Sequence, residues 1–269
     1  MNTRIQGKLQ RLRQQLKDMK SCAIAYSGGV DSSFLITIAY QELGDRALAV
    51  TATSSTYPKR ELKEAELLAH KLGIPHIVIH SEELDIDGFA ENTPDRCYYC
   101  KKELFRKIQQ IAKDHHLAYV LDGSNADDTK DYRPGAKAKE ELRIRSPLQD
   151  VGLTKQEIRE LSKSLHLYTA EKPPLACLAS RFPYGTTITE EKLKKIEAAE
   201  EFLLSLGFRH CRVRYHDSIA RIEVPQKDFQ TILKNAKEIV KRFKGLDFTY
   251  VTLDIEGYRT GSLNEVLPQ

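Results

Sequence analysis

The chain has 269 residues, and its 42 lysines and arginines against 38 aspartates and glutamates give a formal charge of +4. Hydrophobic residues make up 41% of the chain and charged residues 30%, values ordinary for a folded protein with one large domain or two smaller ones. The small net charge argues against a nucleic-acid partner, and the lack of 18 consecutive apolar residues argues against a membrane span. The polar start lacks the apolar stretch of a signal peptide, so we expect a cytoplasmic protein.

The first part of the chain alternates short apolar runs with helical patterns. Strands are predicted at residues 21–26, 46–53, 75–80 and 119–122, and helices at residues 31–43, 59–72 and 96–115. Thr154 and Glu157 have the spacing of a capping box and predict the start of another helix. This alternation predicts an α/β fold in which a parallel sheet is flanked by helices, with ligands bound at the carboxyl ends of the strands.

Two consecutive prolines, Pro173 and Pro174, mark the end of this pattern because they stop helix and sheet alike. We therefore expect one domain over residues 1–170 and a smaller α+β domain over residues 171–269. In the smaller domain, helices are predicted at residues 190–206 and 225–243 and strands at residues 209–215, 218–224 and 248–254.

The segment SGGVDS, residues 27–32, follows the first predicted strand and opens the next helix. Its glycines permit a close approach of the backbone to a ligand, and the helix N-terminus and serine hydroxyls supply donors for an anion. The segment has the spacing of neither a Walker A loop nor a dinucleotide-binding loop. Asp31 and Asp127 are oxygen ligands suited to Mg²⁺ on a polyphosphate, although a solvated turn would also explain Asp127 and Asp128.

Three of the five cysteines form the second candidate site. Cys97 and Cys100 lie on one face at the predicted start of a helix, where the thiolate is favoured. Such a pair can belong to a zinc site, a redox disulfide or an iron–sulfur cluster, or be two unrelated cysteines. With Cys177, near the domain boundary, and no clear fourth zinc ligand, the set suits a [4Fe–4S] cluster whose open iron can bind a sulfide. Cys22 and Cys211 fall in predicted strands and are interpreted as packing residues.

The smaller domain contains a candidate anion site. Arg212 and Arg214 alternate along a predicted strand, so both guanidinium groups lie on one face and can clamp a phosphate. The alternative is a solvated face on which the arginines pair with Glu223. The acidic residues of this domain either balance the arginines or hold a cation; they are Glu200, Glu223 and Asp228.

The SGGVDS loop resembles the signature of the PP-loop ATP pyrophosphatases, which adenylate a substrate and release pyrophosphate. Residues 51–54, the acidic loop at residues 121–128 and Ser-Pro-Leu at residues 146–148 are also similar to that family. The motifs PDRCYYCKKELF, ACLASRFPYGTTIT and RVRYHDSIARIEV together resemble the LarE sulfurtransferases of nickel-pincer nucleotide biosynthesis, over about residues 15–260.

This resemblance implies an enzyme that uses ATP to adenylate a carboxylate of pyridinium-3,5-biscarboxylic acid mononucleotide and then converts it to a thiocarboxylate. One branch of the family sacrifices the sulfur of a single cysteine, and the other transfers a sulfide bound to a [4Fe–4S] cluster. The three cysteines Cys97, Cys100 and Cys177 imply the cluster branch, and sacrificial use of Cys177 is the alternative.

The resemblance also implies the residues that hold each ligand, and a homohexamer. ATP would be held by Ser27, Gly28, Gly29, Asp31, Ser32, Thr53 and Asp127, with Mg²⁺ on Asp31. The phosphate of the small nucleotide substrate would be held by Ser180, Arg181, Arg212 and Arg214. The competing hypotheses are a tRNA thiolase of the same class, an ATP-dependent amide synthase, and a nucleotide-sensing or metal-storage module without catalysis.

Overall fold

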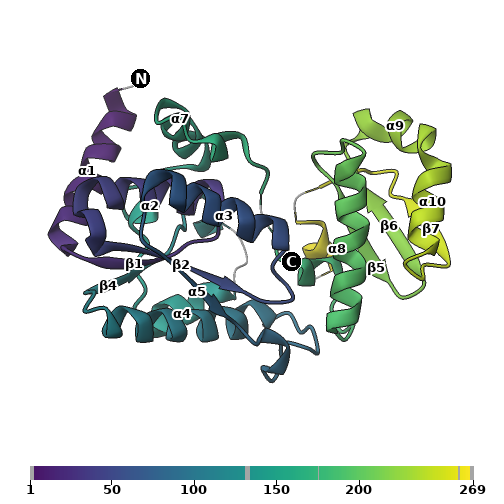
Figure 1. The fold of residues 1–269 in the computed structure, drawn as a ribbon, viewed down its shortest axis with the longest axis horizontal. Coiled ribbons are helices and arrows are strands. Elements are labelled where there is room, and N and C mark those ends of the chain that lie inside the picture. Colours follow the sequence, from purple (N-terminus) through teal and green to yellow (C-terminus); the bar gives the residue numbers. More distant parts are fainter. Residues whose placement is uncertain (1–2, 131–133, 175, 260, 267–269) are drawn as a thin grey trace. The chain divides into compact units, whose positions relative to one another are not determined.

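The structure is a computed structural model that describes residues 3–130, 134–174, 176–259 and 261–266. The chain forms two compact units (Figure 1). The first comprises Met1–Phe89 and Pro94–Leu175, and the second comprises Ala90–Thr93 and Ala176–Gln269. The sequence places a boundary between residues 170 and 171, and it does not predict that residues 90–93 belong to the second unit.

The first unit is built on a parallel sheet with the strand order β3-β2-β1-β4. Its strands are β1 (Cys22–Ala25), β2 (Ala47–Thr53), β3 (His76–His80) and β4 (Tyr119–Leu121). The chain runs outward from β1 through β2 to β3 and then returns to place β4 on the other side of β1. The carboxyl ends of β1 and β4 therefore form the switch point at which α/β sheets bind ligands. The predicted parallel α/β fold is confirmed.

Helices cover both faces of this sheet (Figure 1). Side chains of α1, α2, α3 and α7 pack with Cys22 and Ile24 on one face, and side chains of α4 pack with Ala23 and Val50 on the other. Alternate residues of β1 thus enter separate cores, as the period of a strand requires. The helices are α1 (Thr3–Met19), α2 (Val30–Leu43), α3 (Lys59–Leu72), α4 (Arg96–Asp114), α5 (Gly135–Glu141), α6 (Pro147–Asp150) and α7 (Lys155–Ser164). The capping box at the start of α7 is confirmed, with Thr154 and Glu157 bonded reciprocally.

The second unit contains a three-stranded sheet with the order β5-β6-β7. Strands β5 (Arg212–His216) and β6 (Ile219–Glu223) are antiparallel, and β7 (Tyr250–Leu253) runs parallel to β6. The helices are α8 (Glu190–Ser205), α9 (Phe229–Lys234) and α10 (Ala236–Lys244). The α+β character predicted for this part of the chain is present.

The single helix predicted over residues 225–243 is wrong, because the structure divides it into α9 and α10 at Asn235. The backbone of Asn235 has φ −94° and ψ 9°, and its side-chain amide donates to the carbonyl of Thr231 at 2.8 Å. An asparagine side chain that bonds to the preceding turn competes with the helical backbone, which explains the interruption.

The segment at residues 90–93 is held by the second unit through backbone contacts. Ile188 N–H donates to the carbonyl of Ala90 at 2.9 Å, and Gly185 N–H donates to the carbonyl of Asn92 at 3.1 Å. The fully buried Asn92 side chain donates in turn to the carbonyls of Phe182 and Pro183. This short stretch of sequence carries no pattern that would assign it to either unit.

Candidate active site

The SGGVDS segment at residues 27–32, the predicted phosphate loop, joins β1 to α2 at the switch point of the sheet. Gly28 has φ +64°, and a Cβ atom there would lie 2.9 Å from the Cβ of Ala65 on α3. Only glycine accepts this backbone conformation and this close packing without strain. The hydroxyls of Ser27 and Ser32 lie 3.1 Å apart, and the backbone N–H of Ser27 donates to Ser32 Oγ. Four of the predicted ATP residues are therefore brought together in one loop, with Gly29 at the N-cap of α2.

The loop that follows β4 packs directly on the start of α2. A Cβ atom on Gly123 would lie 3.0 Å from the backbone nitrogen of Ser32, so a larger residue would push the two segments apart. The preceding Asp122 accepts hydrogen bonds from the hydroxyls of Ser124 and Ser146, and Lys139 lies 3.2 Å from its carboxylate. The close packing of Gly123 on Ser32 thus places the acidic loop at residues 121–128 against the phosphate loop.

Asp31, in the first turn of α2, is the carboxylate best suited to a cation. Its Oδ2 accepts a hydrogen bond from the ammonium of Lys155, and its Oδ1 is buried and has no hydrogen-bond partner among the described residues. Burial raises the pKa of Asp31, and the nearby Lys155 opposes this effect. The carboxylate of Asp127 accepts a hydrogen bond from the Lys155 backbone at 2.8 Å. Because a buried carboxylate oxygen without a donor suits a hard cation, Asp31 fits the predicted role of a Mg²⁺ ligand.

The end of β2, which contains the predicted ATP residue Thr53, is connected to α4 through Glu83. Thr53 is half-buried at this end of the strand. One oxygen of Glu83 accepts from the hydroxyls of Ser54 and Thr56, and the other accepts from the thiol of Cys100 at 3.2 Å. Glu83 thus links the nucleotide end of the sheet to one of the predicted cluster ligands.

The thiols are divided between the two units. Cys97 is exposed and Cys100 is half-buried, both in the first turn of α4 in the first unit. Cys177 is half-buried in the second unit, where its carbonyl accepts hydrogen bonds from Ser180. Among the described residues, no three histidine, cysteine or acidic side chains form a group that could hold a metal ion. The three-thiolate cluster site therefore stays a prediction.

The other two cysteines are packing residues, as predicted. Cys22 and Cys211 are both buried, and burial raises the pKa of the Cys22 thiol to about 12.

The predicted substrate-phosphate residues of the second unit lie in a network of buried ion pairs. The guanidinium of Arg181 makes two hydrogen bonds of 2.9 Å to Glu200, and that of Arg214 pairs in the same way with Glu223. Arg214 also donates to the carbonyl of Ser180 at 2.7 Å. The two glutamates therefore balance arginines, which is one of the alternatives that the sequence left open.

Arg212 is half-buried and has different neighbours. It donates to the carbonyl of Cys211 at 2.8 Å, and its guanidinium lies 5.4 Å from the ring centre of Tyr258. Burial and, after it, the positive charge of Arg181 lower the pKa of Arg212, whereas Glu200 and Tyr258 oppose this effect. Asp228, the third acidic residue of the predicted cation site, lies at the N-cap of α9.

Two lysines at the site were missed by the sequence interpretation. Lys155 contacts Asp31 and Asp127, and Lys172 contacts the carbonyl of Gly28. A usable signal for Lys155 was its position directly after the predicted N-cap Thr154, at the start of a helix. The sequence around Lys172 contains no such signal, because the partners of Lys172 lie more than 100 positions earlier in the chain.

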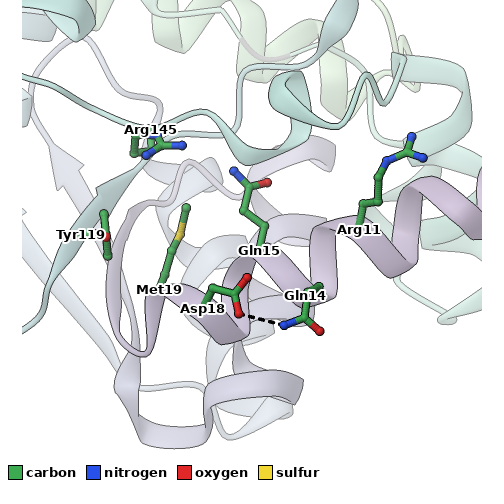
Figure 2. Close-up of a pocket in the computed structure, with 7 residues that line it drawn as sticks. All are labelled: Arg11, Gln14, Gln15, Asp18, Met19, Tyr119 and Arg145. Carbon is green, nitrogen blue, oxygen red and sulfur yellow. Dashed lines mark hydrogen bonds between the residues drawn. The ribbon is translucent and has the colours of Figure 1, made fainter.

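A separate pocket of about 380 Å³ lies at the opposite ends of the strands (Figure 2). Met19, just before β1, and Tyr119, the first residue of β4, both line it, whereas the phosphate loop follows the other end of β1. Figure 2 shows that α1 supplies most of its wall, with Gln14 bonded to Asp18. The pocket is therefore not part of the candidate active site.

No helix within the described parts of the chain is both long enough and apolar enough to cross a membrane.

Comparison with known proteins extends the likeness beyond the phosphate loop. Residues 9–150 match the family described as asparagine synthase. The chain is 42% identical to an uncharacterized protein of Synechocystis sp., over 98% of this chain and 99% of that one. It is 39% identical to the pyridinium-3,5-bisthiocarboxylic acid mononucleotide synthase of Lactiplantibacillus plantarum, over 94% of this chain and 92% of the synthase. The tRNA-specific 2-thiouridylase MnmA of Rickettsia africae is 31% identical over only 56% of this chain and 51% of its own.

The similarity to the Lactiplantibacillus synthase spans both units, and the matched family model covers the sheet and phosphate loop of the first. The ATP-binding loop of the first unit has the sequence and the strand–loop–helix setting of the PP-loop enzymes. The chain belongs to the LarE family, and it is an ATP-dependent sulfurtransferase built on a PP-loop ATP pyrophosphatase domain.

Proposed function

We propose that this enzyme adenylates a carboxylate of pyridinium-3,5-biscarboxylic acid mononucleotide and converts it to a thiocarboxylate, in the biosynthesis of the nickel-pincer nucleotide cofactor. The observation that carries this proposal is the 39% identity to the Lactiplantibacillus synthase over 94% of the chain. The similarity includes the second unit, where a substrate-binding surface rich in arginine would be needed for a nucleotide with a phosphate group.

Adenylation would take place at the phosphate loop. A carboxylate is a poor electrophile because its leaving group would be oxide. In the proposed step, a carboxylate oxygen of the substrate attacks the α-phosphorus of ATP, and pyrophosphate leaves with the electrons of the broken P–O bond. The backbone N–H groups at Gly28 and Gly29 and the N-terminus of α2 would stabilise the developing charge, and Lys155 would add a positive charge.

Asp31 and Asp127 are the residues that would hold Mg²⁺ at this site. The ion would neutralise charge on the polyphosphate as pyrophosphate departs. Support comes from the buried Oδ1 of Asp31, which has no hydrogen-bond partner in the described residues.

Sulfur transfer would use the three thiols Cys97, Cys100 and Cys177. Held by these thiolates, a [4Fe–4S] cluster would leave one iron free to carry the sulfide that is transferred. Attack of sulfur on the carbonyl carbon of the acyl adenylate forms the C–S bond and releases AMP. Glu83 would orient the Cys100 side chain, because its carboxylate already contacts that sulfur.

The phosphate of the substrate would be held in the second unit by Ser180, Arg212 and Arg214. The donors of Arg181 are directed to Glu200, Ser180 and two backbone carbonyls, so its part would be to position this segment. Most donors of Arg214 are also engaged, by Glu223, Ser180 and Ser262, so Arg212 would make the main contact with the phosphate. Metal analysis of the purified protein tests whether Glu200, Glu223 or Asp228 holds a cation.

The first alternative is the sacrificial version of the same reaction. In it the Cys177 thiolate would displace AMP to form a thioester, and elimination would then break its Cβ–S bond, leaving a thiocarboxylate and dehydroalanine. The second alternative is a tRNA thiolase, favoured by the 31% identity to MnmA over 56% of the chain.

The deciding experiment is anaerobic purification with quantification of iron and sulfide, followed by turnover with ATP, Mg²⁺ and the biscarboxylic mononucleotide. We expect a coloured protein that releases pyrophosphate and forms thiocarboxylate without loss of protein mass. Cys97→Ala, Cys100→Ala and Cys177→Ala should each remove the iron, whereas Cys211→Ala, which changes a buried thiol outside the set, should retain it. A colourless enzyme that performs a single turnover and loses the mass of H₂S from Cys177 would establish the sacrificial alternative. We also expect a hexamer in solution, to be measured by light scattering.

A further inference from the structure

Lys172 is a buried cation at the end of the first unit. Only 8% of its side chain is exposed, and its ammonium lies 2.5 Å from Glu61 and 2.7 Å from Glu64, both on α3. The same ammonium donates a hydrogen bond to the carbonyl of Gly28 in the phosphate loop at 3.2 Å. A buried lysine thus joins the phosphate loop to the helix beside it.

The contact with the Gly28 carbonyl has a consequence for the next residue. In a trans peptide, the carbonyl of one residue and the N–H of the following residue lie in one rigid plane and point in opposite directions. The ammonium that holds the oxygen of Gly28 therefore also fixes the direction of the N–H of Gly29. This N–H lies at the N-cap of α2 and is directed to Ser27 Oγ at 3.4 Å, the hydroxyl of another predicted ATP residue.

The preceding peptide is held in the same manner. The hydroxyl of Tyr57 donates to the carbonyl of Ser27 at 2.7 Å. Two successive carbonyls of the loop are thus held from the side of α3, which directs the following N–H groups of Gly28 and Gly29 away from it.

The charge of Lys172 also matters to the site. Glu61 is 5% exposed, and although burial alone would raise its pKa, Lys172 and Arg60 lower it. Glu61 is therefore a carboxylate held next to the loop that must accept a polyphosphate. Without Lys172, its negative charge would oppose the binding of ATP.

The backbone of Lys172 is fixed as well. The guanidinium of Arg159 on α7 donates to the carbonyl of Lys172 at 2.8 Å and also to that of Ala170. The side chain and the main chain of Lys172 are thus held by different helices, directly before the two prolines of the sequence.

We propose that Lys172 is a positioning residue for ATP: its ammonium orients the N–H of Gly29 through the Gly28 carbonyl and neutralises Glu61 beside the phosphate loop. This inference rests on the use of ATP, which family membership shows, and not on the proposed sulfur chemistry or substrate. Direct measurement of ATP binding therefore tests it even where the proposed function fails.

The test is the dissociation constant of Mg·ATP, measured by calorimetry for the full-length protein and three variants. Lys172→Met keeps the length of the side chain without its charge or donors, and we expect it to weaken ATP binding by about tenfold or more. Lys172→Arg retains both and should bind within about threefold of the wild type. Lys163→Met, on α7 with 59% of the side chain exposed, is the matched control and should bind normally.

Unchanged affinity in Lys172→Met, or equal losses in the Met and Arg variants, would overturn the proposal. A merely structural role would lower the melting temperature of Lys172→Met without changing the affinity of the folded protein for ATP. Where Lys172→Met does not fold, Lys172→Gln is measured instead, since its amide can still donate a hydrogen bond. We then expect a loss of at least about threefold, and wild-type affinity of the Gln variant would contradict the proposal.

Discussion

At the scale of single residues, the second unit depends on carboxylates buried with arginines. Glu200 and Glu223 each receive two hydrogen bonds from one guanidinium, a geometry that fixes the arginine as well as neutralising it. The sequence predicted the residue types and left open their pairing. The sequence alone does not decide which arginine pairs with which glutamate, because this depends on which side chains are buried together.

Replacing Arg181 with methionine should strongly destabilise the second unit, because Glu200 would be left buried without its partner. A loss of about 3–5 kcal/mol is typical of such a broken pair, and it can be measured by urea unfolding. Arg209→Met, at an exposed position, is the control and should be nearly neutral.

The same pair gives a pH dependence. Burial alone would raise the pKa of Glu200, but the positive charge of Arg181 has the larger effect. The pKa of Glu200 in the folded protein is therefore below the ordinary value of 4.5. The contribution of the pair is therefore present above that value and is lost as the pH falls through the lower, folded pKa. In wild type the melting temperature should fall more steeply below pH 4.5 than in Glu200→Gln; parallel curves would contradict this.

Lys155 offers a prediction for the nucleotide site. Since its ammonium contacts Asp31, Lys155→Met should leave that buried carboxylate without its positive neighbour and slow pyrophosphate release by at least about tenfold. Lys71→Met, at an exposed position of α3, should release pyrophosphate at the wild-type rate. Equal rates of pyrophosphate release in the wild type and both variants would show that Lys155 does not contribute to the reaction.

At the scale of elements, the strand–loop–helix of the phosphate site was predictable because all its signals are local. The apolar strand, the glycines and the following helix occur within one stretch of the sequence. Both ends of β1 and the start of α2 differ from the predicted bounds by one residue, and the end of α2 is as predicted. The break at Asn235 was not predictable in this way, since asparagine is also tolerated within helices. Long-range partners such as Lys172 and Glu61 leave no periodic signal at all.

The contact between the phosphate loop and α3 can be tested by a pair of substitutions. Gly28→Ala should weaken ATP binding, because the new Cβ would meet the Cβ of Ala65 at 2.9 Å and because φ is +64°. Adding Ala65→Gly removes the collision but leaves the cost of the left-handed backbone, about 1–2 kcal/mol. Calorimetry should therefore show partial recovery in the double variant. Full recovery would mean that the backbone conformation is unimportant.

At the scale of the whole molecule, the net charge is only +4, and the sequence contains no long run of basic residues. We therefore expect weak tRNA binding with little dependence on salt, measured by fluorescence anisotropy at low and moderate ionic strength. A protein that neutralises several phosphates would lose affinity steeply over that range. Such a loss, starting from tight binding, would favour the tRNA thiolase alternative.

The path of the chain between the two units has a consequence for how such enzymes can be recombined. The chain passes from one unit to the other after residues 89, 93 and 175. A single genetic crossover at residue 175 would therefore exchange most of the second unit but leave its residues 90–93 behind. Asn92 would then have to donate to the carbonyls of a foreign Phe182 and Pro183 segment. The second unit of a relative should be transferable only as two matched pieces, and chimaeras that omit the short piece should fold poorly.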